Sequence, residues 1–290
     1  MVQNNPVKTV AIRRKKRYSK EAAPNRAAIW RKGGAPLDLD YDKLLGLTAE
    51  LGYQLMYSGA EIYRVEESAR RLLRSYGLEN PEVFAIPNCL IVSVATPQGH
   101  PVTRMRRVPL HGTDIELLER CNALCRRLCA QVPSLDEAQE AVNALPETPR
   151  YASWQVLLGY GIAPAFFAPL FGGGLRDTAC SFFCGLAVGL CLLYGGKFIG
   201  ANSFFRTAVC SAVAAFLALA LVEAGLGRSV DVVTISTLMV LVPGVALTNA
   251  MREIMAGDTF SALSRTADAI LVASAIALGA AAGQALGGFV

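Results

Sequence analysis

The sequence predicts an integral membrane protein in which a cytoplasmic α+β domain is followed by a bundle of about five transmembrane helices. Hydrophobic residues make up 53% of the chain and its mean hydropathy is +0.36, which is high for a soluble protein. From Trp154 onward, apolar runs of membrane-spanning length recur almost without charge, whereas the preceding stretch is rich in charged side chains. The change in composition at residues 146–150 (PETPR) therefore marks the boundary between a part of the chain that lies in water and a part that lies in lipid.

The first segment, residues 1–36, is predicted to be a disordered basic tail. Its many Lys and Arg side chains are opposed by Glu21 alone, and they stand among Pro and Gly without apolar periodicity. Such a tail favours a cytoplasmic N-terminus and can also attract anionic membrane lipid. Since no apolar stretch follows it, we expect no signal peptide and assign insertion to the first membrane helix.

The second segment, residues 37–148, is predicted to be a cytoplasmic α+β domain in the order helix, strand, strand, helix, helix. Apolar side chains recur every three or four positions from Leu37 to Gly77, which is the spacing of one long amphipathic helix. Gly77 suits the C-cap of this helix, and Gly59 weakens it midway.

Two strands and two helices complete this domain. Residues 83–96 and 101–110 are rich in β-branched side chains and flank a PQGH turn, so they predict an antiparallel pair. Helices are expected at residues 114–130 and 134–145, and a capping box at Ser134 opens the second.

The third segment, residues 149–290, is predicted to be the transmembrane helical domain. Small residues crowd its spans, as in the series Gly279, Gly283 and Gly287, which lets helix backbones pack closely and is favoured here over a pore-lining role. The expected spans are residues 154–171, 178–194, 207–226, 230–250 and 267–289.

The distribution of basic residues predicts a cytoplasmic N-terminus and an extracytoplasmic C-terminus. Lys197, Arg206, Arg252 and Arg265 flank the second and fourth connections, whereas the first and third carry one arginine each. With an odd number of spans, a second copy fused after the first would lie inverted in the membrane, as in many secondary transporters. Because one such half is present, we expect a partner chain or self-association.

The fourth span holds the strongest signal for a functional site. Pro243 and Gly244 interrupt it, and the carbonyls that proline leaves without partners are tolerated in lipid only where protein or a wet cavity covers them. Thr248 and Asn249 can exchange hydrogen bonds with a ligand, and Arg252 can pair with a substrate carboxylate. The alternative is a proline kink followed by an ordinary interfacial loop.

Arg265 and Asp268 lie three residues apart at the start of the fifth span, so they can share a helix face and pair. A gating or proton-linked role and simple interfacial anchoring both stay open for them. Glu223, toward the outer end of the third span, is a weaker candidate of the same kind.

Cys121, Cys125 and Cys129 recur every four residues on one predicted helix. We interpret them as small apolar residues on a core face rather than as a metal site, because His100 and His111 are the only histidines and no CxxC occurs. The cysteines as a set do not resemble a disulfide framework, which fits a reducing compartment.

Motifs of soluble enzymes, including GxSxG, Walker and GxGxxG sequences, are absent. Glu61, Arg64, Glu66 and Glu67 in GAEIYRVEES form a charged cluster at helical spacing, which we interpret as a salt-bridged face. We therefore expect no catalytic residue, no cofactor, no metal and no nucleic-acid partner.

These segments together resemble the bacterial threonine/serine exporter family. The match comprises GAEIYRVEES with the downstream PQG turn and TRMRRV strand, then LVPGVALTNAMREIMAGD with SALSR, and it extends over residues 44–286. The resemblance implies export of small amino or organic acids, by one chain with two membrane halves or by two chains. This sequence is similar to the longer subunit of the two-chain type that exports succinate with a small membrane partner. The motif positions carried over are Glu61, Arg64, Glu66, Pro243, Gly244, Asn249, Arg252 and Asp258.

We therefore expect an inner-membrane transporter subunit that exports threonine, serine or small dicarboxylates by alternating access, with the broken fourth helix as its substrate region. Its expected partners are membrane lipid and a second membrane subunit. The alternatives are a membrane-anchored enzyme with a hydrolase-like cytoplasmic domain and a regulatory subunit. A wet cavity beside Pro243 would favour transport, and a cytoplasmic cleft joining Glu61, Arg64 and Arg106 would favour the enzyme.

Overall fold

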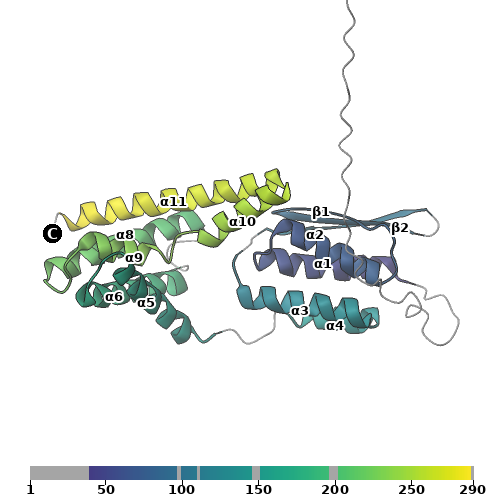
Figure 1. Ribbon diagram of the computed structural model, residues 1–290, viewed down its shortest axis with the longest axis horizontal. Coiled ribbons are helices and arrows are strands. Elements are labelled where there is room, and N and C mark those ends of the chain that lie inside the picture. The colour runs from purple at the N-terminus through teal and green to yellow at the C-terminus, as the bar shows by residue number, and fades with distance from the viewer. Residues whose placement is uncertain (1–38, 97–98, 110–111, 146–150, 196–201, 289–290) are drawn as a thin grey trace, which may run out of the picture. The chain divides into compact units, whose positions relative to one another are not determined.

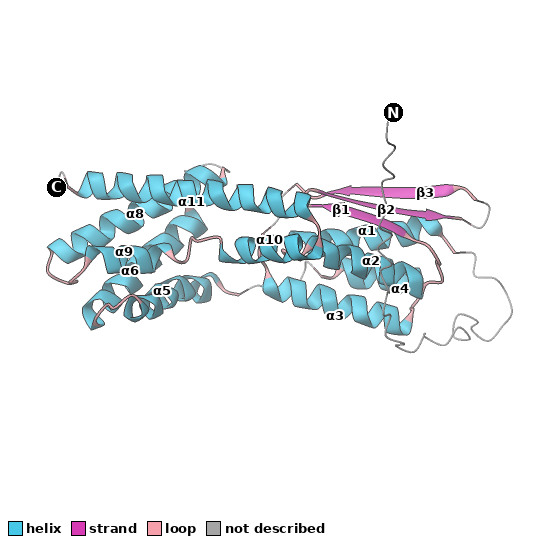
Figure 2. Cartoon of the chain, turned by 45° about the horizontal axis from the view of Figure 1, so that its top comes forward, coloured by secondary structure: helices cyan, strands magenta, loops and turns pink. Residues whose placement is uncertain are grey.

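The computed structural model describes residues 39–96, 99–109, 112–145, 151–195 and 202–288 (Figure 1). The chain divides into two units, Met1–Leu39 and Asp40–Val290. The predicted basic tail, the PETPR boundary and Lys197 lie outside the described residues. Within the second unit, helices α1–α4 and a three-stranded sheet form an N-terminal α+β part, and helices α5–α11 form a C-terminal helical part (Figure 2).

The prediction of one long helix over residues 37–77 is wrong, because the chain forms two helices, α1 (Tyr41–Tyr57) and α2 (Ile62–Ser75). Helix α1 ends in a Schellman motif, in which the Ala60 N–H donates to Leu55 O and the Gly59 N–H donates to Met56 O. Gly59 has φ +95°, and a Cβ there would lie 2.6 Å from Gly112 O. A side chain at this position is therefore excluded by both conformation and space.

The sheet has three antiparallel strands in the order β1-β2-β3, namely β1 (Glu82–Ile86), β2 (Cys89–Ala95) and β3 (Pro101–Arg107). The predicted pairing across the PQGH turn is confirmed by β2 and β3. The prediction of one strand over residues 83–96 is wrong, because Pro87 and Asn88 form a two-residue loop between β1 and β2. Proline lacks a backbone N–H and so cannot continue a paired strand at this point.

The two helices predicted after the sheet are confirmed as α3 (Ile115–Gln131) and α4 (Leu135–Asn143), and α4 opens with the expected capping box at Ser134. Of the cysteine stripe predicted to pack on a core face, Cys121 and Cys125 are buried in the core, whereas Cys129 is only partly buried. The core side chains of this part come from α1, α2, the inner face of the sheet, α3 and α4.

The C-terminal part consists of α5 (Ser153–Leu170), α6 (Leu175–Tyr194), α8 (Ser203–Glu223), α9 (Val230–Leu238), α10 (Gly244–Ala256) and α11 (Thr259–Gly287). Among the described residues, three helices are long and apolar enough to cross a membrane, and these are α6, α8 and α11. They correspond to the second, third and fifth predicted spans. The chain is thus a membrane-embedded protein, while the prediction of five spans stays a prediction.

The predicted interruption of the fourth span is confirmed. Helix α9 ends at Leu238 and α10 begins at Gly244, with Pro243 as the residue that precedes the new helix. Short-range hydrogen bonds replace the helical ladder in between, such as those from Leu241 N–H to Leu238 O and from Gly244 N–H to Val242 O.

Close backbone contact joins α11 to α8. A Cβ on Gly279 would lie 2.1 Å from Ala208 O, and one on Gly283 would lie 2.2 Å from Ala212 O. The glycine series therefore serves packing, as its spacing predicts. Large apolar side chains of this part, such as Phe166 (78% exposed), point outward, as lipid-facing residues do.

Candidate functional site

The two charged motifs, separated by about two-thirds of the chain, meet where the turn between α1 and α2 contacts α10 and α11. On one side stand residues 58–61, and on the other stand side chains of α10 and of the first two turns of α11. Two backbone carbonyls of the turn are bound directly: Asn249 Nδ2 donates to Gly59 O at 3.2 Å, and Arg265 Nη2 donates to Ala60 O at 2.8 Å. We call this contact between residues 58–62 and the helices α10 and α11 the junction.

Glu253 on α10 is the most deeply buried charged residue of the junction, with no exposed surface. Its Oε1 accepts from Arg265 Nε at 2.9 Å and from the Ile62 N–H, at the start of α2, at 3.2 Å. Its Oε2 is buried without a hydrogen-bond partner in the described structure. Burial raises the pKa of this carboxyl above its ordinary value, and the Arg265 charge and the Ile62 N–H offset that effect only in part.

Glu61 forms a second ion pair at the junction. It directly precedes α2, and its side chain is 6% exposed. Its Oε1 accepts from Arg252 Nη1 of α10 at 2.9 Å, and its Oε2 lies 3.3 Å from Arg64 Nε on the next turn of α2. Arg252 is 53% exposed, so most of its five N–H donors remain accessible to a further acceptor.

The elbow between α10 and α11 positions the two helices for these contacts. Gly257 ends α10 with φ +90°, and Asp258 caps α11 by accepting from the Ser261 N–H at 3.1 Å. The Asp258 N–H also donates to Glu253 O at 2.9 Å. The predicted site residue Asp258 therefore acts on the geometry of the elbow.

Glu66, the third charged residue of the first motif, points to the sheet instead. Its Oε1 accepts from the Ala85 N–H at 2.9 Å, while Arg70, paired with Glu66 at 2.7 Å, donates to Val83 O at 2.8 Å. These two side chains satisfy the outer edge of β1, which would otherwise present unpaired backbone groups. The predicted salt-bridged face of α2 is confirmed by this pair and by Glu67 with Arg71 at 2.9 Å.

The other predicted site residues lie on α10 and α11. Thr248 Oγ1 donates to Gly244 O within its own helix and is exposed, and Pro243 and Gly244 begin α10. Asp268 is exposed on α11, one turn beyond Arg265. Arg265 directs its guanidinium to Glu253 and to the turn.

Sequence reasoning missed Glu253. The available signal was its spacing of four residues from Asn249, which places both on the same buried face of α10. Sequence reasoning also did not join Glu61 to Arg252, although both are named in the two motifs. Of the residues named for the alternative cytoplasmic cleft, Glu61 and Arg64 pair with each other, and Arg106 pairs with Glu50 on α1 at 2.8 Å.

Comparison with known proteins shows which family this chain resembles. Residues 47–287 match the family described as putative threonine/serine exporter. The chain is 28% identical over 252 residues to a probable threonine/serine exporter of Mycobacterium tuberculosis, which covers 86% of this chain and 47% of that protein. It is 24% identical over 260 residues to the threonine/serine exporter of Corynebacterium glutamicum, covering 86% of this chain and 53% of that protein.

A third relative is of similar length to this chain. The chain is 23% identical over 238 residues to the probable succinate transporter subunit YjjP of Klebsiella aerogenes, covering 80% of this chain and 90% of that protein. The chain thus spans about half the length of the two exporters and nearly the whole of the subunit. No solved structure matches.

Proposed function

The chain belongs to the threonine/serine exporter family, and we propose that it is one subunit of a secondary transporter that exports a small carboxylate-bearing metabolite across the cytoplasmic membrane. The candidate substrates are the small hydroxy amino acids named for two relatives and the dicarboxylate named for a third. Transport without enzymatic catalysis is the role that these relatives support.

The observation that carries this proposal is the half-exposed Arg252 on α10, the helix that follows the break. Its guanidinium is already oriented by Glu61, and its remaining N–H groups can donate to both oxygens of a substrate carboxylate. A substrate carboxylate bound to these donors would share the charge of Arg252 with Glu61 and so weaken their ion pair. Binding would then loosen the link between α10 and the turn that precedes α2.

The break at residues 239–243 gives α10 the freedom that alternating access requires. Interrupted helices at the middle of transporter bundles bind substrate with unpaired backbone groups and with helix ends. Asn249 and Glu253 of α10 contact the turn and the start of α2, so a movement of α10 would displace these residues of the N-terminal α+β part. That part is proposed to be cytoplasmic, with the C-terminus on the opposite side of the membrane.

The proposal of a partner rests on length and on architecture. The chain matches about half of each exporter, and it matches nearly the whole of a protein named as a subunit. A second membrane half would come from another chain or from self-association, because two inverted halves form the path in many transporters.

Everted membrane vesicles from source cells test this function with the natural partner present. Vesicles from cells with the intact gene should accumulate labelled threonine, serine or succinate, and vesicles from a strain in which the gene is deleted should not. Arg252→Lys keeps the charge but loses the planar fork, so uptake should fall by about tenfold or more. Arg71→Lys is the matched control, because Arg71 makes an exposed pair with Glu67 on α2.

Three results would contradict the proposal. Equal uptake of all three compounds with and without the gene would exclude this transport function. Uptake by Arg252→Lys at the wild-type rate and affinity would place the substrate elsewhere. A purified, reconstituted chain should show no flux by itself, so robust flux from a demonstrated monomer would contradict the subunit assignment.

A further inference from the structure

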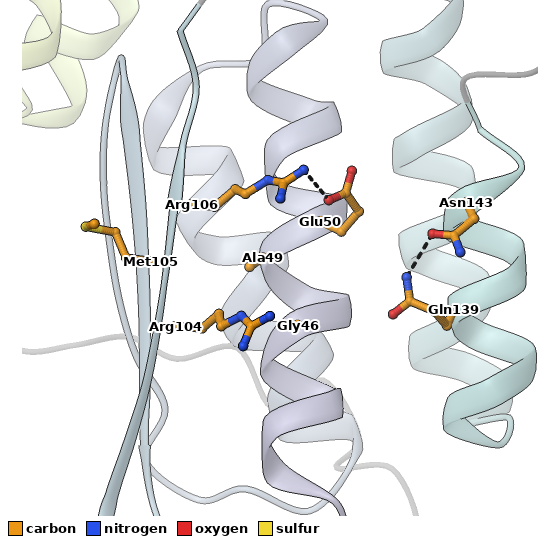
Figure 3. A pocket seen from close by; sticks show the side chains of 8 residues that line it. All are labelled: Gly46, Ala49, Glu50, Arg104, Met105, Arg106, Gln139 and Asn143. Atoms are coloured by element: carbon orange, nitrogen blue, oxygen red, sulfur yellow. Dashed lines mark hydrogen bonds and ion pairs between the residues drawn. The ribbon is translucent and has the colours of Figure 1, made fainter.

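A pocket of about 440 Å³ opens in the N-terminal α+β part between α1, β3 and α4 (Figure 3). Its polar walls are formed by Glu50 of α1, Arg104 and Arg106 of β3, and Gln139 and Asn143 of α4. None of these residues takes part in the junction contacts described above. The volume is within the usual range for small-molecule sites.

Small residues keep the floor of the pocket open. Gly46 and Ala49 lie one turn apart on α1 and both line the pocket. A Cβ built on Gly46 meets no heavy atom within 4 Å, so the space above this residue is empty of protein. Glycine inside a helix lowers helix stability. At Gly46 the missing side chain leaves the pocket open.

The walls carry charges of both signs in fixed positions. Arg106 Nη2 lies 2.8 Å from Glu50 Oε2, and its guanidinium also lies over the Tyr53 ring at 4.9 Å from the centroid. Arg104 is anchored outside the pocket by Asp42 at 3.2 Å. Both arginines are about half exposed, at 52% and 49%, and so retain donors for a ligand.

The α4 wall adds an amide pair. Gln139 Nε2 donates to Asn143 Oδ1 at 2.9 Å, which leaves the Gln139 carbonyl oxygen and the Asn143 amide protons available (Figure 3). Such a pair can both donate to and accept from a hydroxyl group.

We propose that this pocket binds a free α-amino acid with a small polar side chain, as a regulatory site separate from the translocation path. The two arginines are complementary to the α-carboxylate, Glu50 to the α-ammonium group, and the amide pair to a side-chain hydroxyl. A dicarboxylate would place its second charge against Glu50, and a single-sign anion would compete with Glu50 for Arg106 without offering Glu50 a cation. A zwitterion satisfies both signs.

Helix α1 connects this pocket to the junction. It supplies Gly46 and Glu50 to the pocket and ends in the turn whose Gly59 and Ala60 carbonyls are bound by Asn249 and Arg265. Occupancy of the pocket would hold α1 against β3 and α4 and so stabilise the position of this turn. The site would thereby adjust the transporter to the amino-acid concentration on its own side of the membrane.

Hydrogen–deuterium exchange of the full chain in lipid nanodiscs locates such binding directly. L-Threonine and L-serine should slow exchange in residues 101–107 and 135–143. Threonine amide, which lacks the carboxylate, and N-acetyl-threonine, which lacks the ammonium group, should not. Succinate should give no protection in these two segments.

Two variants and a control tie the protection to the pocket. Arg106→Gln removes a carboxylate partner, and Gly46→Leu fills the floor while all charges remain; each should weaken the protection by about tenfold or more in apparent affinity. Arg71→Gln should not change it, because Arg71 lies on α2, which contributes no residue to the lining of the pocket. Unchanged melting curves identify the variants that remain folded.

Absence of protection in both segments with either amino acid would overturn the proposal, as would equal protection by succinate. Protection that survives in both pocket variants would also overturn it. Vesicle uptake separates this site from the transport function. If Arg252→Lys loses uptake but keeps the threonine-dependent protection, the defect lies at the junction and not at this pocket.

Discussion

Arg265 near the start of α11 donates from Nε to Glu253 Oε1 of α10 at 2.9 Å, and the two side chains are 8% and 0% exposed. The same guanidinium reaches Ala60 O at 2.8 Å. One cation thus compensates a buried carboxylate and holds the turn between α1 and α2. A buried pair of this kind is costly to break from one side, because the remaining charge loses its partner.

Arg265→Met is expected to destabilise the protein by about 3–5 kcal/mol, because it leaves the Glu253 carboxylate buried without a cation. The thermal unfolding midpoint in detergent measures the effect. Glu253→Gln should cost less, since burial already disfavours the charged form of this carboxyl. The double variant Arg265→Met/Glu253→Gln should recover part of the loss, and a sum of the two single effects would show that the residues do not interact.

Stability should also depend on pH in a way that identifies Glu253. Its pKa is raised in the folded protein, so protonation favours the folded state, and this group's contribution falls as pH rises from the unfolded pKa through the folded one. Arg265→Met should therefore regain stability on acidification, as the buried charge is removed. The melting midpoint of Arg265→Met/Glu253→Gln should lack this extra rise, and equal pH profiles for both variants would assign the effect to another group.

Gly283→Ala should destabilise the helical part by about 1–3 kcal/mol, although alanine favours helices. The added Cβ would lie 2.2 Å from Ala212 O, a backbone atom of α8 that cannot turn away. The matched control is Gly159→Ala in α5, where a Cβ meets nothing within 4 Å. Melting midpoints of the two variants in the same detergent decide the question, and equal midpoints would contradict close packing of α8 and α11.

Cys129 on α3 should be the most reactive thiol of the N-terminal part. Hydrogen bonding by the Cys125 thiol, then by Ser75, lowers the pKa of Cys129 to about 7 against the effect of burial, whereas burial raises the pKa of Cys121 to about 12. Near neutral pH about half of Cys129 is then the nucleophilic thiolate. Brief iodoacetamide treatment followed by peptide mass spectrometry should show Cys129 modified more than tenfold faster than Cys121.

The pH dependence of that reaction gives its control. The alkylation rate of Cys129 should rise with a midpoint near pH 7, because the reactive form appears as the thiol loses its proton. Ser75→Ala removes one of the hydrogen bonds and should shift this midpoint upward. A midpoint near the ordinary thiol value in the unsubstituted protein would contradict the assigned environment.

The division of the chain into an α+β part and an apolar helical part was determined by the sequence alone. Hydrophobic content over windows of about 20 residues is a local property, and so are the capping box at Ser134 and the interruption by Pro243 and Gly244. Each depends on residues within a few positions of one another. The structure accordingly confirms α3, α4, the β2–β3 pair and the break before α10.

Local rules failed where a distant contact decides the conformation. Apolar side chains recur at helical spacing on both sides of Gly59, yet the chain turns there. The carbonyl of Gly112 leaves no room for a side chain at Gly59, and residues of α10 and α11 bind the turn. The partners at the junction are separated by 191 residues for Ile62 and Glu253 and by 205 for Ala60 and Arg265. From the sequence alone, Glu61, Arg252 and Arg265 are recognisable as charged residues of the two motifs. Only the tertiary structure decides that Glu61 pairs with Arg252 and Glu253 with Arg265, because burial and distance, which set the strength of each ion pair, exist only after the two motifs have been brought together.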